Sequence, residues 1–168
     1  KELTDTLDWE AKPIKIFGKE VMQPRLMAWY GEPEAEYTYS GTTFPAKPFT
    51  PALLQIKQDI EAYTKTQFNS ALANLYRNGQ DSMGWHSDDE SELGRNPIIA
   101  SLSFGEERVF KLRHRNDKTR KLDVPLPHGS LLVMGGTMQH YWQHSLSKSA
   151  KDLKPRINLT FRHIFAQV

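Results

Sequence analysis

The chain has 168 residues, of which 38% are hydrophobic and 25% are charged, and it contains no cysteine. This length fits one domain with a core of its own, and the lack of cysteine excludes disulfide bonds and thiolate metal sites. A net charge of +2 is compatible with nucleic-acid binding but does not demonstrate it.

No apolar run approaches the length needed to cross a bilayer, and no charged and then apolar signal segment begins the chain. We therefore expect an intracellular protein without membrane contact, cytoplasmic if the source is bacterial and nuclear if it is eukaryotic. Because the first residue is Lys1 rather than Met, we also expect an N-terminal segment to precede it.

The first elements in chain order are a turn-rich segment and a helix. Residues 37–51 are rich in Thr, Ser, Gly and Pro, which predicts a loop or hairpin. Thr50 and Pro51 then precede apolar residues at helical spacing, namely Leu53, Ile56, Ile60 and Tyr63. This pattern predicts a capped amphipathic helix with proline in its first turn.

Short strands dominate the rest of the chain. The best candidates are separated by Gly, Pro or charged clusters, and they cover residues 70–76, 98–104, 108–113, 131–134 and 156–163. Many short strands with few helices predict a mainly β protein, a jelly roll of two sheets.

The most informative motif is His86-Ser87-Asp88, with His144 far downstream. In a strand or extended loop, positions i and i+2 point the same way, so His86 and Asp88 can reach one ion. Two imidazoles and one carboxylate form the facial triad of non-heme Fe(II) oxygenases. H-x-D alone is a weak signal, and His140, four residues before His144, is an alternative third ligand.

The tail of the chain strengthens this interpretation. Alternation places Arg156, Asn158, Thr160 and Arg162 on one face of a strand whose other face is apolar. Two inward guanidiniums need anions, and a dicarboxylate fits because arginine binds carboxylates in a bidentate way. A solvated or salt-bridged edge strand is the alternative for such a pattern on its own.

Six motifs occur in an order that resembles a known family. They are N-x-Y-x-x-G from Asn74, H-x-D-D-E from His86, P-I-I-A-S-L-S-F-G, L-P-H-G-S-L-L-V-M, H-S-L from His144 and R-x-N-x-T-F-R from Arg156. Together they resemble the AlkB family of iron- and 2-oxoglutarate-dependent dealkylating dioxygenases, over residues 14–164. The resemblance is closest to the DNA-repair branch that includes the vertebrate nuclear homologues.

The resemblance implies a fold and a domain organisation. The fold would be a double-stranded β-helix (jelly roll), mainly β with flanking helices, carrying an N-terminal nucleotide-recognition lid. Residues 1–168 would form a single dioxygenase domain. The N-terminal segment and lid would occupy about residues 10–50, and the β-helix core about residues 68–165.

The resemblance also implies the roles of the site residues. The H-S-L match selects His144 over His140, so that the Fe(II) ligands would be His86, Asp88 and His144. Arg156 would bind the distal carboxylate of 2-oxoglutarate, Arg162 would orient the carboxylate near the metal, and O₂ would be the second cosubstrate. The supporting residues would be Asn74, Tyr76, Asn158 and Thr160.

The reaction implied is oxidative demethylation of 1-methyladenine and 3-methylcytosine in single- or double-stranded DNA. A base cannot reach buried iron inside a duplex, so it must be flipped out or unpaired. Tyr39 would stack on the base, although alternating tyrosines in a hairpin also pack well in a core, and Tyr37 would contact the backbone. Glu90 could hydrogen-bond the exocyclic amine, or it could belong to a solvated acidic turn. Trp85 and the ring face of His86 are further candidate walls.

Other substrate contacts are open to a second interpretation. Phe17 would fill the gap left by a flipped base, although a core phenylalanine is an equal alternative. Arg113 and the basic residues after it could bind phosphates or simply form a solvated face. A basic clamp is sparser after His144 than in the duplex-repair relatives, which weakens the case for duplex preference.

Several classes compete with DNA repair. An RNA demethylase of the same fold is the first alternative, and a protein hydroxylase is a more distant one. A catalytically silent nucleic-acid-binding module is the third, but the intact motif residues argue against it. We expect a monomer.

Overall fold

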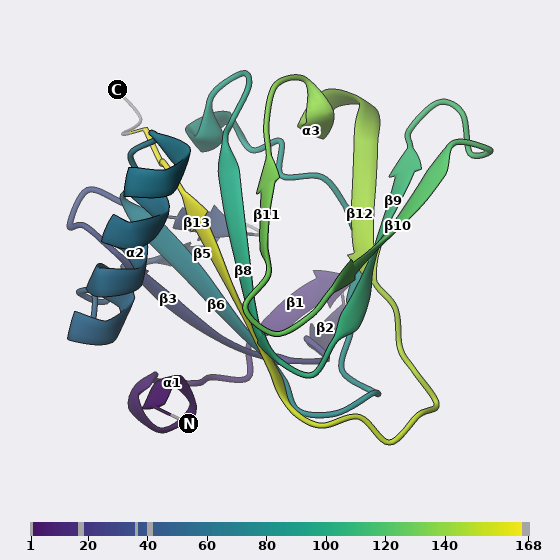
Figure 1. Cartoon of the computed structure of the whole chain (residues 1–168), viewed down its shortest axis with the longest axis horizontal. Helices are drawn as coiled ribbons and strands as arrows, with labels where there is room; N and C mark the ends of the chain where they lie inside the picture. Colours follow the sequence, from purple (N-terminus) through teal and green to yellow (C-terminus); the bar gives the residue numbers. More distant parts are fainter. Residues whose placement is uncertain (1, 17–18, 36, 40–41, 166–168) are drawn as a thin grey trace.

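Two antiparallel β-sheets form the body of the molecule (Figure 1), in a computed structural model that describes residues 2–16, 19–35, 37–39 and 42–165. The larger sheet has five strands in the order β11 (Leu131–Met134), β8 (Ile99–Gly105), β13 (Arg156–Arg162), β6 (Ser70–Tyr76) and β3 (Leu26–Gly31). The smaller sheet has four strands in the order β10 (Lys121–Leu126), β9 (Arg108–His114), β12 (Trp142–Leu146) and β7 (Met83–His86).

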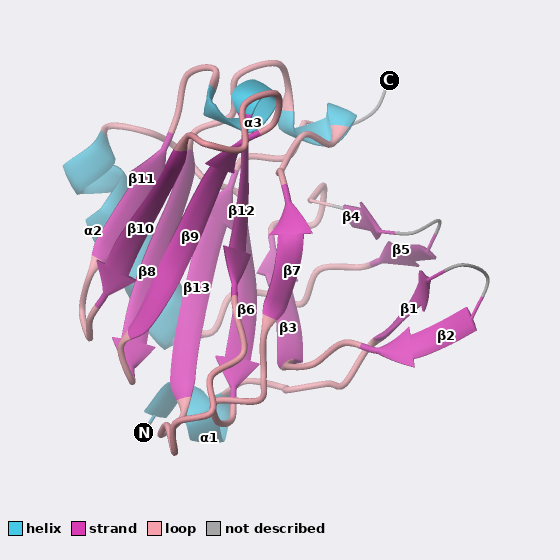
Figure 2. Ribbon diagram, turned by 90° about the vertical axis from the view of Figure 1, so that its right-hand side faces the viewer, coloured by secondary structure: helices cyan, strands magenta, loops and turns pink. Residues whose placement is uncertain are grey.

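Two small hairpins and four short or medium helices complete the fold. The hairpins are β1–β2 (Pro13–Ile16 and Lys19–Met22) and β4–β5 (Tyr37–Tyr39 and Thr42–Phe44), and both project from the same side of the sheets in Figure 2. The helical segments are α1 (Glu2–Thr6), α2 (Pro51–Thr64), the 3₁₀ turn η1 (Ser91–Leu93) and α3 (Met138–Tyr141).

Helix α2 covers the outer face of the larger sheet (Figure 1). It begins where the Thr50 side chain accepts a hydrogen bond from the Leu53 backbone N–H, and it ends at Lys65, which has the left-handed φ of 55°. Its buried Leu53 and Ile60 belong to the same core cluster as Leu159 and Phe161 of β13. This packing explains why the apolar face of β13 is buried.

Strand β13 is central in the larger sheet, between β8 and β6, and all seven of its residues are buried. Its apolar side chains face the α2 core, so its polar side chains face the interior between the two sheets. The opposing inner face of the smaller sheet contributes Phe110 and Leu112 to a second core cluster. The functional residues of β13 therefore lie inside the molecule.

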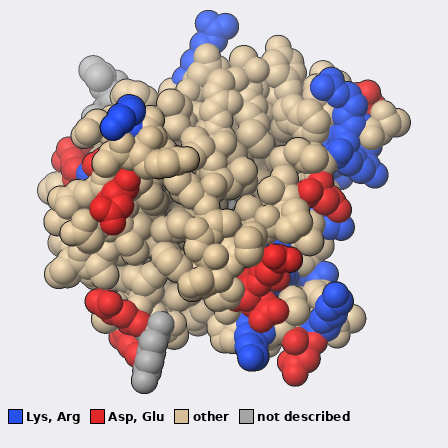
Figure 3. All heavy atoms as spheres, viewed as in Figure 1, with Lys and Arg blue, Asp and Glu red and all other residues tan. Residues whose placement is uncertain are grey.

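The outer face of the smaller sheet is more open. Val109 is exposed on it, and Lys and Arg side chains gather at the tip of the β9–β10 hairpin, as Figure 3 shows. The exposed basic residues there are Lys118, Arg120 and Lys121. Among the helices of the described residues, none is long and apolar enough to cross a membrane.

The predicted fold class is confirmed, and so are the predicted helix and strands. The strands over 70–76 and 131–134 match β6 and β11 at both ends. The strands over 108–113 and 156–163 differ by one residue at their C-terminal ends, and the strand over 98–104 is shifted by one residue at both ends relative to β8. The segment 37–51 contains a hairpin, as one of the two expectations had it. The strands that the sequence did not predict include β7 and β10, which contain Gly84 and Pro125. Proline is tolerated in β10 because this strand lies at the edge of its sheet.

Candidate active site

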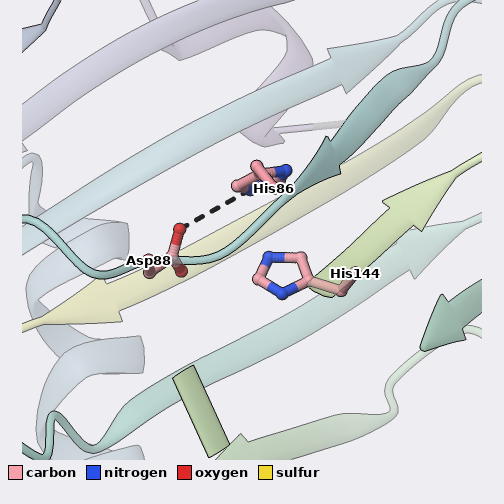
Figure 4. Close-up of side chains that lie close together, drawn as sticks. All are labelled: His86, Asp88 and His144. Carbon is pink, nitrogen blue, oxygen red and sulfur yellow. Dashed lines mark ion pairs between the residues drawn. The ribbon is translucent and has the colours of Figure 1, made fainter. Parts of the chain in front are cut away.

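His86, Asp88 and His144 come together between the two sheets. His86 ends β7 and pairs with His144 of the neighbouring β12, while Asp88 follows β7 by two residues. One ligand atom from each side chain lies within 4.8 Å of the other two. The Nε2 of His86 and the Oδ1 of Asp88 are 3.5 Å apart, and Figure 4 shows the three side chains converging.

The tautomer of His86 is fixed by its backbone. Its Nδ1 lies 2.9 Å from the carbonyl oxygen of Gly84, which can only accept a hydrogen bond. The proton therefore sits on Nδ1, and the lone pair of Nε2 points toward the other two residues as metal ligation requires. The centroid of the His144 ring lies 4.2 Å from that of the His86 ring and 5.1 Å from that of the Phe110 ring, on which it stacks. These two contacts hold the His144 ring in place.

The electrostatics keep these groups in the protonation states that a metal needs. Burial would raise the pKa of Asp88, but the Arg162 guanidinium and the neighbouring histidines outweigh it and hold that pKa well below its usual range. Burial, together with the neighbouring His86, lowers the pKa of His144 to about 4. At pH 7 the site thus offers one carboxylate and a neutral His144 imidazole, the donor types that suit Fe(II).

The loop that carries Asp88 is held by side chains from other elements. The Asp88 backbone N–H donates to the Oε1 of Gln139, 2.9 Å away, and Gln139 is only 2% exposed. The Ser87 hydroxyl donates to the Trp142 carbonyl at 2.8 Å, and Arg115 hydrogen-bonds to both Ser87 and Asp89. The sequence analysis did not predict a role for Gln139, because an amide in a short helix is typical of a surface residue.

The cosubstrate residues predicted from β13 share one side of the interior. In the register of the larger sheet, Arg156 lies opposite Tyr76 and Asn158 lies opposite Asn74. Asn158 donates to the Ser101 hydroxyl at 2.7 Å and accepts from the Thr160 hydroxyl at 2.9 Å. These contacts fix the polar face of β13.

Two arginines adjoin this polar face in different ways. Arg25, which the sequence analysis missed, donates through Nε to the Oδ1 of Asn74 at 2.8 Å. Arg156 is 2% exposed and donates to the Ser103 hydroxyl at 2.9 Å, but its buried Nε has no hydrogen-bond partner among the described residues. A buried guanidinium with an unused N–H group fits an incoming carboxylate.

The other histidines lie elsewhere and have ordinary partners. In the described part of the chain, the triad is the one cluster of His, Asp or Glu side chains that could hold a metal ion. His140 is exposed and pairs with Asn96 at 3.0 Å, and the Nδ1 of His128 accepts from the Gly105 N–H. His114 accepts from two backbone N–H groups of its own turn, and His163 packs on Phe165.

Two of the predicted substrate residues, Trp85 and Arg113, do not face the triad. Trp85 is 37% exposed and lies against Arg113, whose guanidinium carbon is 4.2 Å from the ring centroid. Arg113 also donates to Gln143, the residue before His144, so this pair occupies the opposite face of the smaller sheet from the triad.

The remaining substrate candidates are placed only in part. Glu90 is half-buried and directly precedes η1, two residues after Asp88. Tyr37 and Tyr39 are the first and last residues of β4. Phe17 lies outside the described residues, so its predicted role as a wedge stays a prediction.

Comparison with known proteins identifies the class. Residues 1–162 match the 2OG-Fe(II) oxygenase superfamily. The chain therefore belongs to this superfamily, whose cofactor Fe(II) and cosubstrates 2-oxoglutarate and O₂ are those that the motifs predicted. The His–Asp–His cluster, in which Asp88 and His144 are buried and His86 is partly exposed, and the two buried arginines fit these groups.

Individual relatives support the narrower resemblance. The chain is 51% identical over 152 residues to alpha-ketoglutarate-dependent dioxygenase alkB homolog 3 of Bos taurus, covering 85% of this chain and 52% of that protein. It is 42% identical over 158 residues to DNA oxidative demethylase ALKBH2 of Homo sapiens, covering 90% and 60%. The predicted resemblance to the AlkB family is thus confirmed, and the chain spans about half the length of the first of these curated relatives.

The structural comparison supports the fold. The solved structure of OsALKBH1 matches with a TM-score of 0.66 at 19% sequence identity, covering 92% of this chain and 83% of that chain. At this identity the likeness concerns the jelly-roll fold alone.

Proposed function

We propose that this chain removes alkyl groups oxidatively from N-alkylated bases in DNA, with 1-methyladenine and 3-methylcytosine as substrates, as a direct-reversal repair enzyme. The observation that carries the proposal is the His86–Asp88–His144 cluster, with Asp88 and His144 buried, beside an interior that also holds Arg156 with an unused N–H group. The names of the two relatives, a dioxygenase and a DNA oxidative demethylase, support the same reaction.

The chemistry divides between the bound groups and the protein. When bound, Fe(II) and 2-oxoglutarate supply the oxidation, in which one O₂ and one 2-oxoglutarate yield succinate, CO₂ and a hydroxylated methyl group. The hydroxymethyl group then leaves its ring nitrogen as formaldehyde: its hydroxyl proton is released, and the electrons of the broken C–N bond return to the nitrogen as its lone pair. The protein orients the reactants and excludes water.

Named residues supply that orientation. Arg156 binds the distal carboxylate of 2-oxoglutarate, and Tyr76, Asn74 and Thr160 complete its surroundings. Arg162 keeps Asp88 ionised through the Nη2–Oδ2 contact of 2.9 Å and lies on the side where the other carboxylate would sit.

The substrate base must leave the helical stack to reach this interior. We propose that Tyr39 stacks on the base, that Tyr37 contacts the backbone and that Glu90 binds the exocyclic amine. Trp85 and Arg113 face outward, so contacts to flanking nucleotides suit them better than a wall of the base pocket. The exposed basic residues of the β9–β10 hairpin tip complement phosphates in charge.

The wider properties of the protein are proposed on the same basis. Residues 10–50, which contain both small hairpins, would form the nucleotide-recognition lid, and residues 68–165 the catalytic core of a single monomeric domain. The protein would act inside the cell without membrane contact, in the cytoplasm of a bacterium or the nucleus of a eukaryote. RNA is the second candidate substrate, because the outward basic hairpin suits any phosphodiester strand.

The test is anaerobic reconstitution with Fe(II) and 2-oxoglutarate, followed by air and a methylated oligonucleotide. Mass spectrometry on matched single-stranded DNA, duplex DNA and RNA should show the loss of one methylene unit, and the relative rates rank the three substrates. The Asp88→Ala variant is the negative control. Succinate formation without change in any oligonucleotide would leave the oxygenase chemistry intact and contradict a nucleic-acid substrate.

A further inference from the structure

A third buried arginine, Arg108, lies near Arg156 and the predicted site of the distal carboxylate. Arg108 is the first residue of β9 and is 5% exposed. Its guanidinium donates to three backbone carbonyls, those of Asn78 at 3.3 Å, Asp81 at 3.0 Å and Ser147 at 2.7 Å. It therefore ties the β6–β7 connection to the end of β12.

Arg108 and Arg156 share one aromatic neighbour. The guanidinium carbon of Arg108 lies 5.7 Å from the ring centroid of Tyr76, and that of Arg156 lies 5.3 Å from the same centroid. Tyr76 is 2% exposed, and the one hydrogen-bond partner of its hydroxyl among the described residues is the weak acceptor sulfur of Met83, at 3.9 Å. Two cations thus lie over one buried ring whose hydroxyl has capacity for a better partner.

In the described part of the chain, these two guanidiniums have no carboxylate in direct contact, although the charge of Asp81 acts on Arg108 from nearby and partly offsets the lowering of its pKa by burial. Among the described residues, no Asp or Glu forms an ion pair with Arg108 or Arg156. The nearby Asp81 is held by Arg77, which contacts both of its carboxylate oxygens at 2.8 and 3.0 Å. Burial lowers the pKa of both Arg108 and Arg156, a sign of the cost of keeping two cations there.

We propose that Arg108 is a positioning residue of the 2-oxoglutarate site, an inference that rests on the proposed function. Its guanidinium fixes the Tyr76 ring so that the hydroxyl faces the distal carboxylate. Its charge adds to that of Arg156, so the pocket selects oxo acids that carry a second carboxylate. A buried cation that lacks an ion-pair partner is stabilised when an anion arrives, and this gain appears as affinity for the dianion.

The alternative is that Arg108 only ties backbone segments together. That role predicts equal effects on every oxo acid, whereas an electrostatic role predicts an effect that depends on the distal carboxylate. Two acids separate these cases, namely 2-oxoglutarate and 2-oxopentanoate, which has the same chain length without the second carboxylate.

The experiment measures direct binding of both acids to the Mn(II)-loaded chain under argon, by quenching of tryptophan fluorescence. The variants are Arg108→Gln, which removes the charge and keeps an N–H donor, and Arg108→Lys, which keeps the charge. The matched control is Lys111→Gln, which removes one positive charge from the outward face of the same strand. Thermal unfolding shows that each variant is folded.

We expect Arg108→Gln to weaken the binding of 2-oxoglutarate on the order of tenfold and to leave the affinity for 2-oxopentanoate unchanged. This magnitude corresponds to the loss of one charge about 10 Å from the distal carboxylate at an effective dielectric constant of about 20. Arg108→Lys and Lys111→Gln should keep the wild-type preference for the dicarboxylate. In turnover with a methylated oligonucleotide, Arg108→Gln should raise KM for 2-oxoglutarate more than it lowers kcat.

The inference would be overturned if Arg108→Gln weakened the binding of both acids equally, or if it left the preference for 2-oxoglutarate over 2-oxopentanoate unchanged. If the Gln variant does not fold, a loss of the preference in the Lys variant has the same meaning. Failure of wild-type protein to bind 2-oxoglutarate at all would instead overturn the proposed function and this inference with it.

Discussion

The two ends of β13 hold the same residue type in opposite electrostatic situations. At one end, Arg162 contacts the Asp88 carboxylate at 2.9 Å, and both groups are buried. At the other end, the equally buried Arg156 has a serine hydroxyl and an aromatic ring as neighbours, and no carboxylate of the described residues pairs with it. Both side chains lie on the same polar face of the strand, because they are six residues apart.

The difference lies in whether the described residues of the protein neutralise the guanidinium. The Arg162 end is neutralised by the protein itself, so its arginine holds a metal ligand in its ionised form. The Arg156 end carries a cost of burial that a carboxylate of the cosubstrate would remove. Substitutions at the two ends should therefore separate stability from binding.

The largest effect is expected from Asp88→Ala, at the completed end. Turnover and Mn(II) binding should be abolished, because the carboxylate of the triad is gone. The unfolding midpoint should also fall, because Arg162 is left buried without its partner. A turnover assay and thermal unfolding check both expectations, with Asp123→Ala on the edge strand β10 as a control that removes an exposed carboxylate. Normal activity of Asp88→Ala would refute the metal site.

Arg156→Met tests the other end. KM for 2-oxoglutarate should rise on the order of 100-fold, since a charge-assisted bidentate contact is lost. Stability should stay the same or increase, because an uncompensated buried charge is replaced by an apolar chain. The matched Arg162→Met should instead destabilise the fold in urea titrations. Similar losses of stability in both variants would erase the proposed distinction between the two ends.

A smaller effect is expected from Gln139→Leu, which removes the acceptor of the Asp88 backbone N–H. The carboxylate would remain, but its loop would be held less firmly, and residues that orient metal ligands in this way typically affect metal affinity about tenfold or more. Titration with Mn(II) measures this, and Gln139→Glu, which keeps an acceptor oxygen, should recover most of the affinity. Unchanged affinity in the Leu variant would limit Gln139 to packing.

The smallest effect is expected from Asp81→Asn, near the Arg156 end. Burial would raise the pKa of Asp81, but hydrogen bonds from the Arg77 side chain and backbone outweigh it and hold that pKa below the ordinary 3.8. A lowered pKa stabilises the fold above the unfolded-state value, and this contribution is lost as the pH falls through the folded-state value.

Asp81→Asn should therefore lower the free energy of unfolding by about 1 kcal/mol at pH 7. The expected effect is this small because Arg77 is half exposed, and solvent screens its interaction with Asp81. This difference from wild type should shrink as the pH falls below the ordinary carboxyl pKa and vanish once the pH is below the lower folded-state value. Urea unfolding across that range measures it. Weakened binding of 2-oxoglutarate by Asp81→Asn would contradict the view that this acid belongs to Arg77 and not to the ligand site.

The sequence alone predicted the parts of the molecule in which local pattern and structure agree. The alternation of β13 is complete over seven residues, because one face meets the α2 core and the other meets the interior between the sheets. Helix α2 has both its cap at Thr50 and its apolar spacing within 15 residues. The H-x-D motif identified two of the residues that gather at the triad because i and i+2 share a direction.

The parts that the sequence did not predict depend on contacts between distant segments. Gln139 and Asp88 are 51 positions apart, and Arg25 and Asn74 are 49 apart. Nothing in the neighbourhood of Gln139 or Arg25 distinguishes it from a surface residue. Strand β7 was missed for a local reason, since its four residues include Gly84 and have no alternation of apolar and polar side chains.

The central place of β13 has a consequence for how the chain avoids misfolding. A slip of one residue in its pairing with β6 or β8 would turn Arg156 and Arg162 into the apolar cluster under α2 and turn Ile157, Leu159 and Phe161 toward the polar interior. These two arginines would therefore also destabilise any pairing of β13 that is shifted by an odd number of residues. On this strand, selection for catalysis and selection for fidelity of folding would act on the same side chains.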